Sequence, residues 1–461
     1  MRGAPVSISV TCPACAKRLK AKDELAGRLL PCPNCKQQIL IPEPGEELAS
    51  YSLQAQAPPA PPPQTRTDEE VPTPRRRQTS HASPKRRKPD LASLPPLTTN
   101  EPPLWLRHLH WLLVLALLPL AFSLLHPGGE KEGIQERIDK TIEQAPLDVQ
   151  LRIAPVEERI EKGEASSDDF FAALPGQKVI GAFLPHNSHA HWGFAAGSAV
   201  LFMAFFLLLS ASKTAEPLHL LGIGLFTATI GILLLLTLQL LAHLTQGVWL
   251  RGGGVVTIIF YIVKLIGFSY QAALDPENGF ILSFLGYTLG VGFCEEVCKA
   301  LPLLWHYRQP SDRGWRTAFL WGLASGAGFG ISEGITYAGD YYNGVHGLDI
   351  YIVRFISCVA LHALWTGSVG ITLQQKQGLI QGEMAWHEYI PRLVVIVGIP
   401  MVLHGLYDTL LKKDMNAGAL AVAVLSFLFL AFQISRLHGA DDDAAREAML
   451  REYKRRRAAM S

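Results

Sequence analysis

The chain has 461 residues, of which 49% are hydrophobic and 18% are charged. These averages hide a division, because residues 1–104 are polar and rich in proline whereas residues 105–436 carry long apolar segments. So many long apolar segments exclude an ordinary soluble core. The formal net charge of +2 decides little, since basic and acidic blocks cancel along the chain. The composition therefore predicts an all-α polytopic membrane protein with a small polar N-terminal part.

Four of the seven cysteines lie in the first 35 residues, as the pairs Cys12–Cys15 and Cys32–Cys35. Such spacing is typical of a zinc ribbon, in which two tight turns offer four thiolates to one tetrahedral structural zinc ion. Two disulfides, or a ribbon that has lost its metal, would leave the same spacing. Thiolate ligation also indicates a reducing compartment. We predict a structural Zn²⁺ in a ribbon over residues 1–44, which could dock a cytoplasmic protein partner.

Residues 45–104 follow the predicted ribbon and are rich in proline and basic residues. This composition buries too little apolar surface to fold, so we predict a disordered linker. Its basic clusters, Arg75–Arg77 and Lys85–Lys88, could contact nucleic acid or the anionic lipid beside a membrane span. Lipid is favoured because apolar segments follow directly. Residues 1–30 lack an apolar signal-peptide stretch, so no cleaved signal is expected.

Nine apolar runs, each long enough for a span of about 20 residues, lie at 105–125, 192–210, 217–245, 254–274, 279–305, 318–339, 350–374, 391–411 and 417–434. Between the first two runs, residues 126–190 are polar and acidic, which predicts an extramembrane segment on the non-cytoplasmic side. Ile134, Ile138 and Ile142 recur there every four residues, which predicts a short amphipathic helix. Residues 105–436 would form the membrane domain, followed by a charged tail over 437–461.

Nine spans would place the two chain ends on opposite sides of the membrane. The basic loop at 308–316 and the basic tail at 437–461 are both expected in the cytoplasm. The run 254–274 follows three glycines and carries Lys264. A re-entrant or interfacial position for that run would leave eight spans, which we prefer, with both chain ends in the cytoplasm. The predicted location is the inner (plasma) membrane.

Two adjacent carboxylates and a lysine, Glu295, Glu296 and Lys299, interrupt one apolar run. A charge at the bilayer centre costs on the order of 2.5–3.5 kcal/mol on insertion scales, so such residues are rare and usually functional. Glu295 and Lys299 share a helical face, whereas Glu296 lies about 100° around the helix. The simplest interpretation is a buried Glu295–Lys299 ion pair with Glu296 facing a polar cavity.

Three further apolar runs also carry polar groups at mid-membrane depth. Their candidate residues are Glu333 with Tyr337, then His362, then His404 with Asp408. Each group alone could be helix-packing glue, but Ser or Thr would do that at lower cost. Because lipid cannot satisfy them, these carboxylates and imidazoles are expected to face one another. An active site and a proton or ion pathway both remain open on these residues.

The polar residues, in this order on successive predicted spans, resemble the motifs of the PrsW family of intramembrane proteases, which is related to the type II CAAX prenyl proteases. The matching motifs are Glu295-Glu296-x-x-Lys299, Gly330-x-x-Glu333-x-x-x-Tyr337, His362 and His404-x-x-x-Asp408. The resemblance covers residues 195–435. Prenyl proteases typically carry an arginine one position after Lys299, and the residue at Asp408 can be asparagine. These departures favour the PrsW branch and argue against a prenylated substrate.

The resemblance implies hydrolysis of a peptide bond in or near the membrane-spanning segment of a membrane-anchored protein. On this interpretation Glu295 takes a proton from a water held between it and His362, since burial raises carboxylate basicity. His404, oriented by Asp408, would stabilise the oxyanion or hold the same water. The remaining candidates are Glu296 and Glu333, with Lys299 to balance charge.

The need for a catalytic metal stays open at this stage. Two histidines and a carboxylate could hold a catalytic Zn²⁺ with one open position, or the same groups could act without metal. The sequence lacks a His-Glu-x-x-His helix. Cys294, Cys298 and Cys358 fit small apolar packing better than nucleophilic catalysis. The alternative function is a non-catalytic membrane sensor, scaffold or proton-coupled transporter. Because no internal repeat of the carrier kind is visible, we favour a protease.

Overall fold

The computed structural model describes residues 7–11, 18–22, 29–34, 38–40, 108–125, 133–210, 216–382 and 385–459. The chain forms two compact units, Met1–Lys88 and Pro89–Ser461.

The first unit contains two short antiparallel hairpins. Strand β1 (Ser7–Thr11) pairs with β2 (Arg18–Lys22), and strand β3 (Leu29–Pro31) pairs with β4 (Gln38–Leu40). Each predicted cysteine pair therefore falls, in sequence, between the two strands of one hairpin.

Among these cysteines, Cys32 is described and buried. Cys12, Cys15 and Cys35 lie outside the described residues, as does the predicted linker at 45–104. The zinc ribbon and the disordered linker therefore stay predictions.

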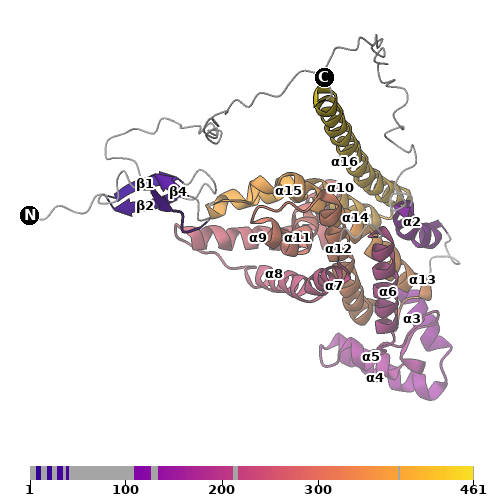
Figure 1. Cartoon of the computed structure of the whole chain (residues 1–461). Coiled ribbons are helices and arrows are strands. Elements are labelled where there is room, and N and C mark those ends of the chain that lie inside the picture. Colours follow the sequence, from indigo (N-terminus) through magenta and orange to yellow (C-terminus); the bar gives the residue numbers. More distant parts are fainter. Residues whose placement is uncertain are drawn as a thin grey trace, which may run out of the picture. The chain divides into compact units, whose positions relative to one another are not determined.

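The second unit is all-helical in its described part (Figure 1). Its membrane helices are α2 (His110–Leu125), α6 (His191–Leu209), α7 (Pro217–Phe226), α8 (Ile232–Leu244), α9 (Val255–Leu274), α10 (Phe280–Gly286), α11 (Phe293–Tyr307), α12 (Trp315–Tyr337), α13 (Leu348–Ile352), α14 (Val359–Gln375), α15 (Trp386–Lys412) and α16 (Asn416–Ala459). Short π-helical turns, η4 (Thr227–Gly231), η5 (Tyr287–Gly292), η6 (Ala338–Tyr342) and η7 (Val353–Cys358), continue some of these helices, and η8 (Gln377–Leu379) is a 3-10 turn.

By length and composition, seven helices of the described part could cross a membrane: 191–209, 217–244, 255–274, 280–307, 348–375, 387–412 and 416–441. The shorter apolar helix α2 and the glycine-rich α12 complete the nine apolar runs expected from the sequence. The prediction of an all-helical membrane domain is confirmed. The run 254–274, considered above as re-entrant or interfacial, forms one continuous 20-residue helix.

Helices α12 and α14 lie at the buried centre of the bundle, and their backbones are in direct contact. A Cβ atom added at Gly322 would lie 2.2 Å from the carbonyl oxygen of Thr366, and one at Gly326 would lie 2.2 Å from that of His362. Only glycine permits this approach, as is common where membrane helices pack closely. The contact fixes α14, which carries His362, against the helix that carries Glu333.

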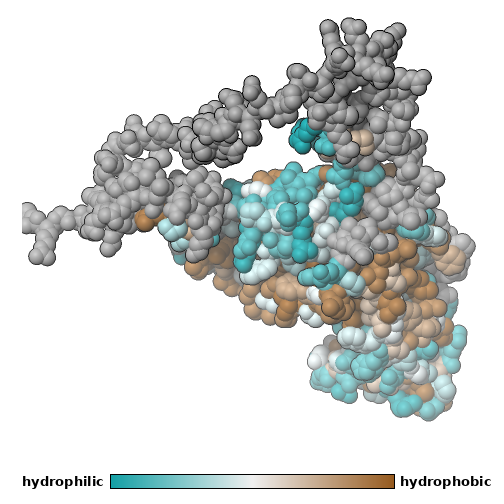
Figure 2. All heavy atoms as spheres, viewed as in Figure 1, coloured by the Kyte–Doolittle hydropathy of each residue, from teal (hydrophilic) through white to brown (hydrophobic). Residues whose placement is uncertain are grey.

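The segment between α2 and α6 forms a small helical subdomain, which the sequence predicts to lie outside the membrane. Its helices are α3 (Ile134–Glu143), α4 (Leu147–Glu161) and α5 (Ser167–Ala173), followed by the 3-10 turn η3 (Pro175–Gln177). The predicted amphipathic helix is α3, whose Ile138 and Ile142 pack against a buried cluster formed by Ala145, Val149, Ile153, Leu174, Val179 and Ala182. Its surface is largely hydrophilic, in contrast to the apolar sides of the bundle (Figure 2).

Main-chain hydrogen bonds join this subdomain to the loop that follows α12. The amide of Val179 donates to Gly344 O, and the amide of Phe183 donates to His346 O, at 2.9 and 2.8 Å. Arg137 donates to the carbonyl of Val345 as well. The subdomain therefore holds the connection between the helices that carry Glu333 and His362.

Candidate active site

Helix α11 places three charged side chains at the centre of the bundle. The ammonium nitrogen of Lys299 lies 3.1 Å from Glu295 Oε2 and 2.8 Å from Glu296 Oε1. The expected Glu295–Lys299 pair is confirmed. The expectation that Glu296 faces a cavity is wrong, because its side chain is fully buried between Lys299 and His404. Glu296 therefore acts inside the protein, behind the site.

His404 of α15 is held from behind by Glu296. Its Nδ1 lies 3.2 Å from Glu296 Oε1, while its Nε2 lies 3.7 Å from Glu295 Oε2 and 3.5 Å from Asp408 Oδ2. The ring of Trp365 stacks on the imidazole with centroids 4.3 Å apart. Asp408 and Glu295 thus both lie near Nε2 of His404. Glu296 contacts the other ring nitrogen, Nδ1, and is therefore the group that orients the ring.

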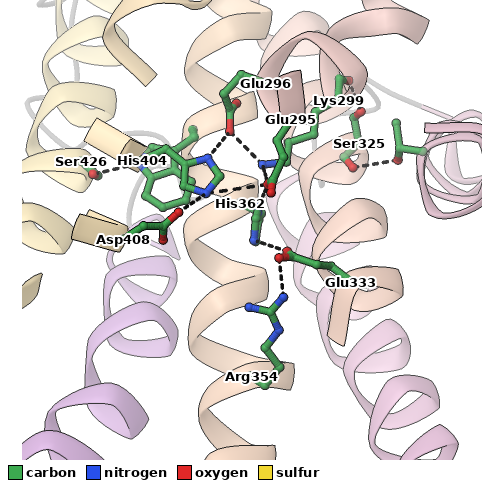
Figure 3. A network of polar contacts seen from close by, with 12 residues as sticks. Glu295, Glu296, Lys299, Ser325, Glu333, Arg354, His362, His404, Asp408 and Ser426 are labelled. Carbon is green, nitrogen blue, oxygen red and sulfur yellow. Dashed lines mark hydrogen bonds and ion pairs between the residues drawn. The ribbon is translucent and has the colours of Figure 1, made fainter. Parts of the chain in front are cut away.

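His362 of α14 is arranged in the same manner. Its Nε2 lies 2.9 Å from Glu333 Oε2, and Glu333 Oε1 in turn lies 2.6 Å from the guanidinium of Arg354. Its Nδ1 lies 4.0 Å from Glu295 Oε2 and has no hydrogen-bond partner among the described residues. Figure 3 shows both imidazoles beside Glu295, with Glu333 and Arg354 on the far side of His362.

Glu295, His362 and His404 fit a divalent metal ion. One ligand atom from each lies within 4.8 Å of the others, and all three residues are buried. Ligands of a tetrahedral zinc ion lie roughly 3.4 Å apart, so small movements would complete the site. A carboxylate behind each imidazole is the usual support of metal-bound histidine. The unpartnered Nδ1 of His362 is a buried atom that such an ion would satisfy.

The formal charge of the buried polar network also favours a bound divalent cation. The network drawn in Figure 3 joins four carboxylates to the two cations Lys299 and Arg354, which leaves two negative charges when the histidines are neutral. Uncompensated charge is costly in a low-dielectric interior, and a divalent cation would cancel it.

The site opens into a cavity of about 970 Å³. Its walls include Glu295, His362, His404, Glu333, Asp408 and Arg354. Polar side chains from α8 and α9 line the same cavity. A peptide segment could therefore reach the three candidate ligands.

The structure thus brings together all six candidates expected from the sequence, although their catalytic roles stay predictions. Sequence reasoning missed Arg354, which had the same signal as the others, namely a charge inside an apolar run. It also missed Trp365, whose stacking on His404 no local pattern reveals. Cys294 and Cys298 pack in an apolar cluster with Leu235.

Buried carboxylates and imidazoles that converge on one cavity define a hydrolase site of the metal-dependent kind, set within a membrane-helix bundle. Residues 216–434 match the model of a protein family described as PrsW family intramembrane metalloprotease. This part of the chain is therefore a PrsW-family intramembrane metalloprotease domain. The protein is an enzyme and a multi-pass membrane protein. Neither a curated protein nor a solved structure matches the chain.

Proposed function

We propose that the protein hydrolyses a peptide bond in or near the transmembrane segment of a membrane-anchored protein. The observation that carries this proposal is the meeting of three buried side chains, Glu295, His362 and His404, at one cavity. Amide hydrolysis requires an activated water and a group that stabilises the developing oxyanion. Both can be supplied at this point, where the three side chains are buried in the helix bundle.

The proposed metal ligands are Glu295, His362 and His404, with an open position for water or substrate. A bound Zn²⁺ would supply Lewis acidity and a water of lowered pKa. Glu296 and Glu333 hold the two imidazole rings so that the nitrogens facing Glu295 are unprotonated and free to coordinate.

Asp408 is the carboxylate that we propose as general base. Its side chain is 24% exposed, against 6% for Glu295, and its Oδ2 lies 3.5 Å from His404 Nε2. It takes a proton from the attacking water as the C–O bond forms and delivers it to the amine as the C–N bond breaks. The sequence favoured Glu295 for this role. Glu295 now serves better as a ligand, because it faces both imidazoles.

We propose that residues 1–44 form a zinc ribbon that docks or senses a cytoplasmic protein partner. The paired strands that precede and follow each cysteine pair in the sequence support the proposal, since ribbon knuckles occupy hairpin turns. Four thiolates from Cys12, Cys15, Cys32 and Cys35 would hold the ion.

The proposed location is the inner (plasma) membrane, with the ribbon and the tail in the cytoplasm. This topology requires an even number of crossings, and we propose eight. Helix α9, which follows three glycines and carries Lys264, is the helix that would not cross completely. Membrane-impermeant labelling of single cysteines placed at its two ends would test this, because labelling from opposite sides contradicts the proposal.

The activity test uses the full-length protein in liposomes with a panel of single-span membrane proteins. We expect the wild type to cleave at least one of them and Glu295→Gln and His362→Ala to lose about 10²–10⁴-fold in rate. Circular dichroism and thermal unfolding would show that the variants remain folded. Cleavage by either variant at the wild-type rate would contradict the site.

Metal content separates the two proposed zinc sites. We expect about two equivalents of zinc in the wild type, about one after Cys12→Ser with Cys15→Ser, and about one in His362→Ala. Activity should follow the site in the membrane and survive loss of the ribbon zinc. A zinc content of about one equivalent in both the active wild type and His362→Ala, lost on Cys12→Ser with Cys15→Ser, would argue for metal-free catalysis with Glu295 as the base.

A further inference from the structure

One side of the cavity carries polar residues that the proposed chemistry does not use. Gln239 and His243 of α8, Gln246 in the turn after α8, and Tyr270 and Gln271 of α9 all line the cavity. We call these five residues the polar wall. The rest of α8 is apolar, and Leu233, Leu240 and Leu244 are exposed on its outer surface. Polar side chains in such a helix are costly unless they have partners.

The spacing of the polar wall gives it a length. Gln239 and His243 lie four residues apart on α8, so they share one face, and Gln246 follows three residues later in the turn that ends the helix. They span about two helical turns, or roughly 10 Å. An extended peptide rises about 3.3 Å per residue, so the wall matches roughly three residues of unwound chain.

The cavity also offers an unused donor from helix α15. Tyr407 is 4% exposed and lines the same cavity, yet its hydroxyl has no hydrogen-bond partner among the described residues. A buried hydroxyl without a partner costs about 1–3 kcal/mol, so it calls for a ligand. The cavity that holds Glu295, His362 and His404 is therefore also lined by polar groups from α8, α9 and α15.

A substrate segment creates the need for such groups. In a transmembrane helix every main-chain N–H and C=O is bonded within the helix, so the carbonyl to be attacked is shielded. Exposing it unwinds about one turn, and each freed group costs several kcal/mol in lipid. Side-chain amides and hydroxyls can accept and donate these bonds, whatever the substrate side chains are.

We infer that the polar wall is a substrate-binding subsite that hydrogen-bonds the main chain of a transmembrane segment unwound next to the scissile bond. This inference rests on the proposed proteolytic function. It assigns to the polar wall the place where the unwound main chain is held next to the scissile bond. Glycine and other helix-weakening residues near the cleaved bond would lower the cost of unwinding.

Kinetics on matched variants test the subsite. The probe is a synthetic single-span peptide that the wild type cleaves in liposomes. We expect Gln239→Leu and Gln246→Leu each to lower kcat/KM by about 2–10-fold, the value of one or two hydrogen bonds. The control Leu240→Ala, on the outer surface of the same helix, should change it less than about 2-fold. Zinc content should stay at the wild-type level in all three.

A second probe shows whether the main chain is the group recognised. One amide next to the scissile bond is replaced by an ester, which removes a single N–H donor. If a glutamine binds that N–H, the ester and Gln→Leu losses will not add, and a double-mutant cycle will show the coupling. Additive losses at every ester position would overturn the inference while leaving the proteolytic function intact.

Photocrosslinking tests binding without turnover. A benzophenone amino acid at position 246 or 240 is introduced into the full-length Glu295→Gln variant, with the same single-span peptide in liposomes. We expect crosslinks from position 246 and few from position 240. Equal crosslinking at the two positions, or none at 246, would overturn the subsite. A wild type that cleaves no probe would count against the proposed function, whereas crosslinking still decides on the subsite.

Discussion

The pair α12–α14 and the pair α8–α9 border the same cavity but are built differently. In α12–α14, glycines bring the two backbones into contact. In the span 348–375, which contains α14, 56% of the most apolar stretch is buried. In the spans that contain α8 and α9, the buried shares are 22% and 17%. One pair is fixed by close packing, and the other offers most of its surface to lipid.

This difference matches the needs of a hydrolase in a membrane. Metal ligands and their supporting carboxylates must keep their geometry to within a fraction of an ångström, so they belong on tightly packed helices. A surface that receives a substrate helix must adapt and be reached sideways from the bilayer. The outer, weakly packed helices α8 and α9 meet that condition.

The largest expected effect comes from breaking the tight pair. Gly326→Val places a side chain where a Cβ would already lie 2.2 Å from the His362 carbonyl oxygen, so α12 and α14 must separate. We expect a loss of about 3 kcal/mol or more in stability, the upper end of overpacking costs. Thermal unfolding in detergent and the yield of folded protein would measure it.

The matched control is Gly222→Val on α7. A Cβ at that glycine meets nothing within 4 Å, so the change should cost less than about 0.5 kcal/mol. Equal destabilisation by the two substitutions would show that the α12–α14 contact is not special.

A second substitution pair compares side-chain packing in the two regions. Leu364 of α14 is 1% exposed, whereas Leu233 of α8 is 58% exposed. Leu364→Ala should leave a cavity and cost about 2–5 kcal/mol, and Leu233→Ala, which faces lipid, should cost less than about 1 kcal/mol. Urea or detergent unfolding in parallel would decide. A large cost at Leu233 would mean that α8 packs against a further partner.

The sequence predicted the helices well because span length is set by the bilayer. Each of the nine apolar runs overlaps an observed helix, although α16 continues beyond the last run to Ala459. The Glu295–Lys299 contact was also predictable, since it is local to one helix. The partners of Glu296 and Arg354 were not, because these contacts join different helices and depend on their packing. The polar wall was missed for a related reason: glutamines on apolar helices resemble packing residues until a cavity is seen.

A smaller effect is expected where the support of a ligand is weakened. Glu333→Gln keeps the shape of the side chain but removes the charge that faces His362 Nε2 and Arg354. We expect zinc affinity and activity to fall about 10–100-fold, as for other carboxylates behind metal-bound histidine. Zinc titration against a competing chelator would measure the affinity. An unchanged affinity with lost activity would instead place Glu333 in the reaction itself.

The smallest expected effect lies at Arg137, through which the subdomain between α2 and α6 contacts the loop after α12. Arg137 donates to the carbonyls of Ile180 and Val345, so Arg137→Gln should loosen this loop by about 1–2 kcal/mol. Faster amide exchange over 343–347 would show it, and Arg152→Gln, which removes only an exposed pair with Asp148, should leave exchange unchanged.

The same substitution is expected to change the pKa of His346. Burial is the largest cause that lowers this pKa, and the charge of Arg137 is the next. Removing that charge should therefore raise the pKa of His346, and NMR titration would detect the shift. An unchanged pKa would mean that Arg137 does not lie close to this loop in the wild type.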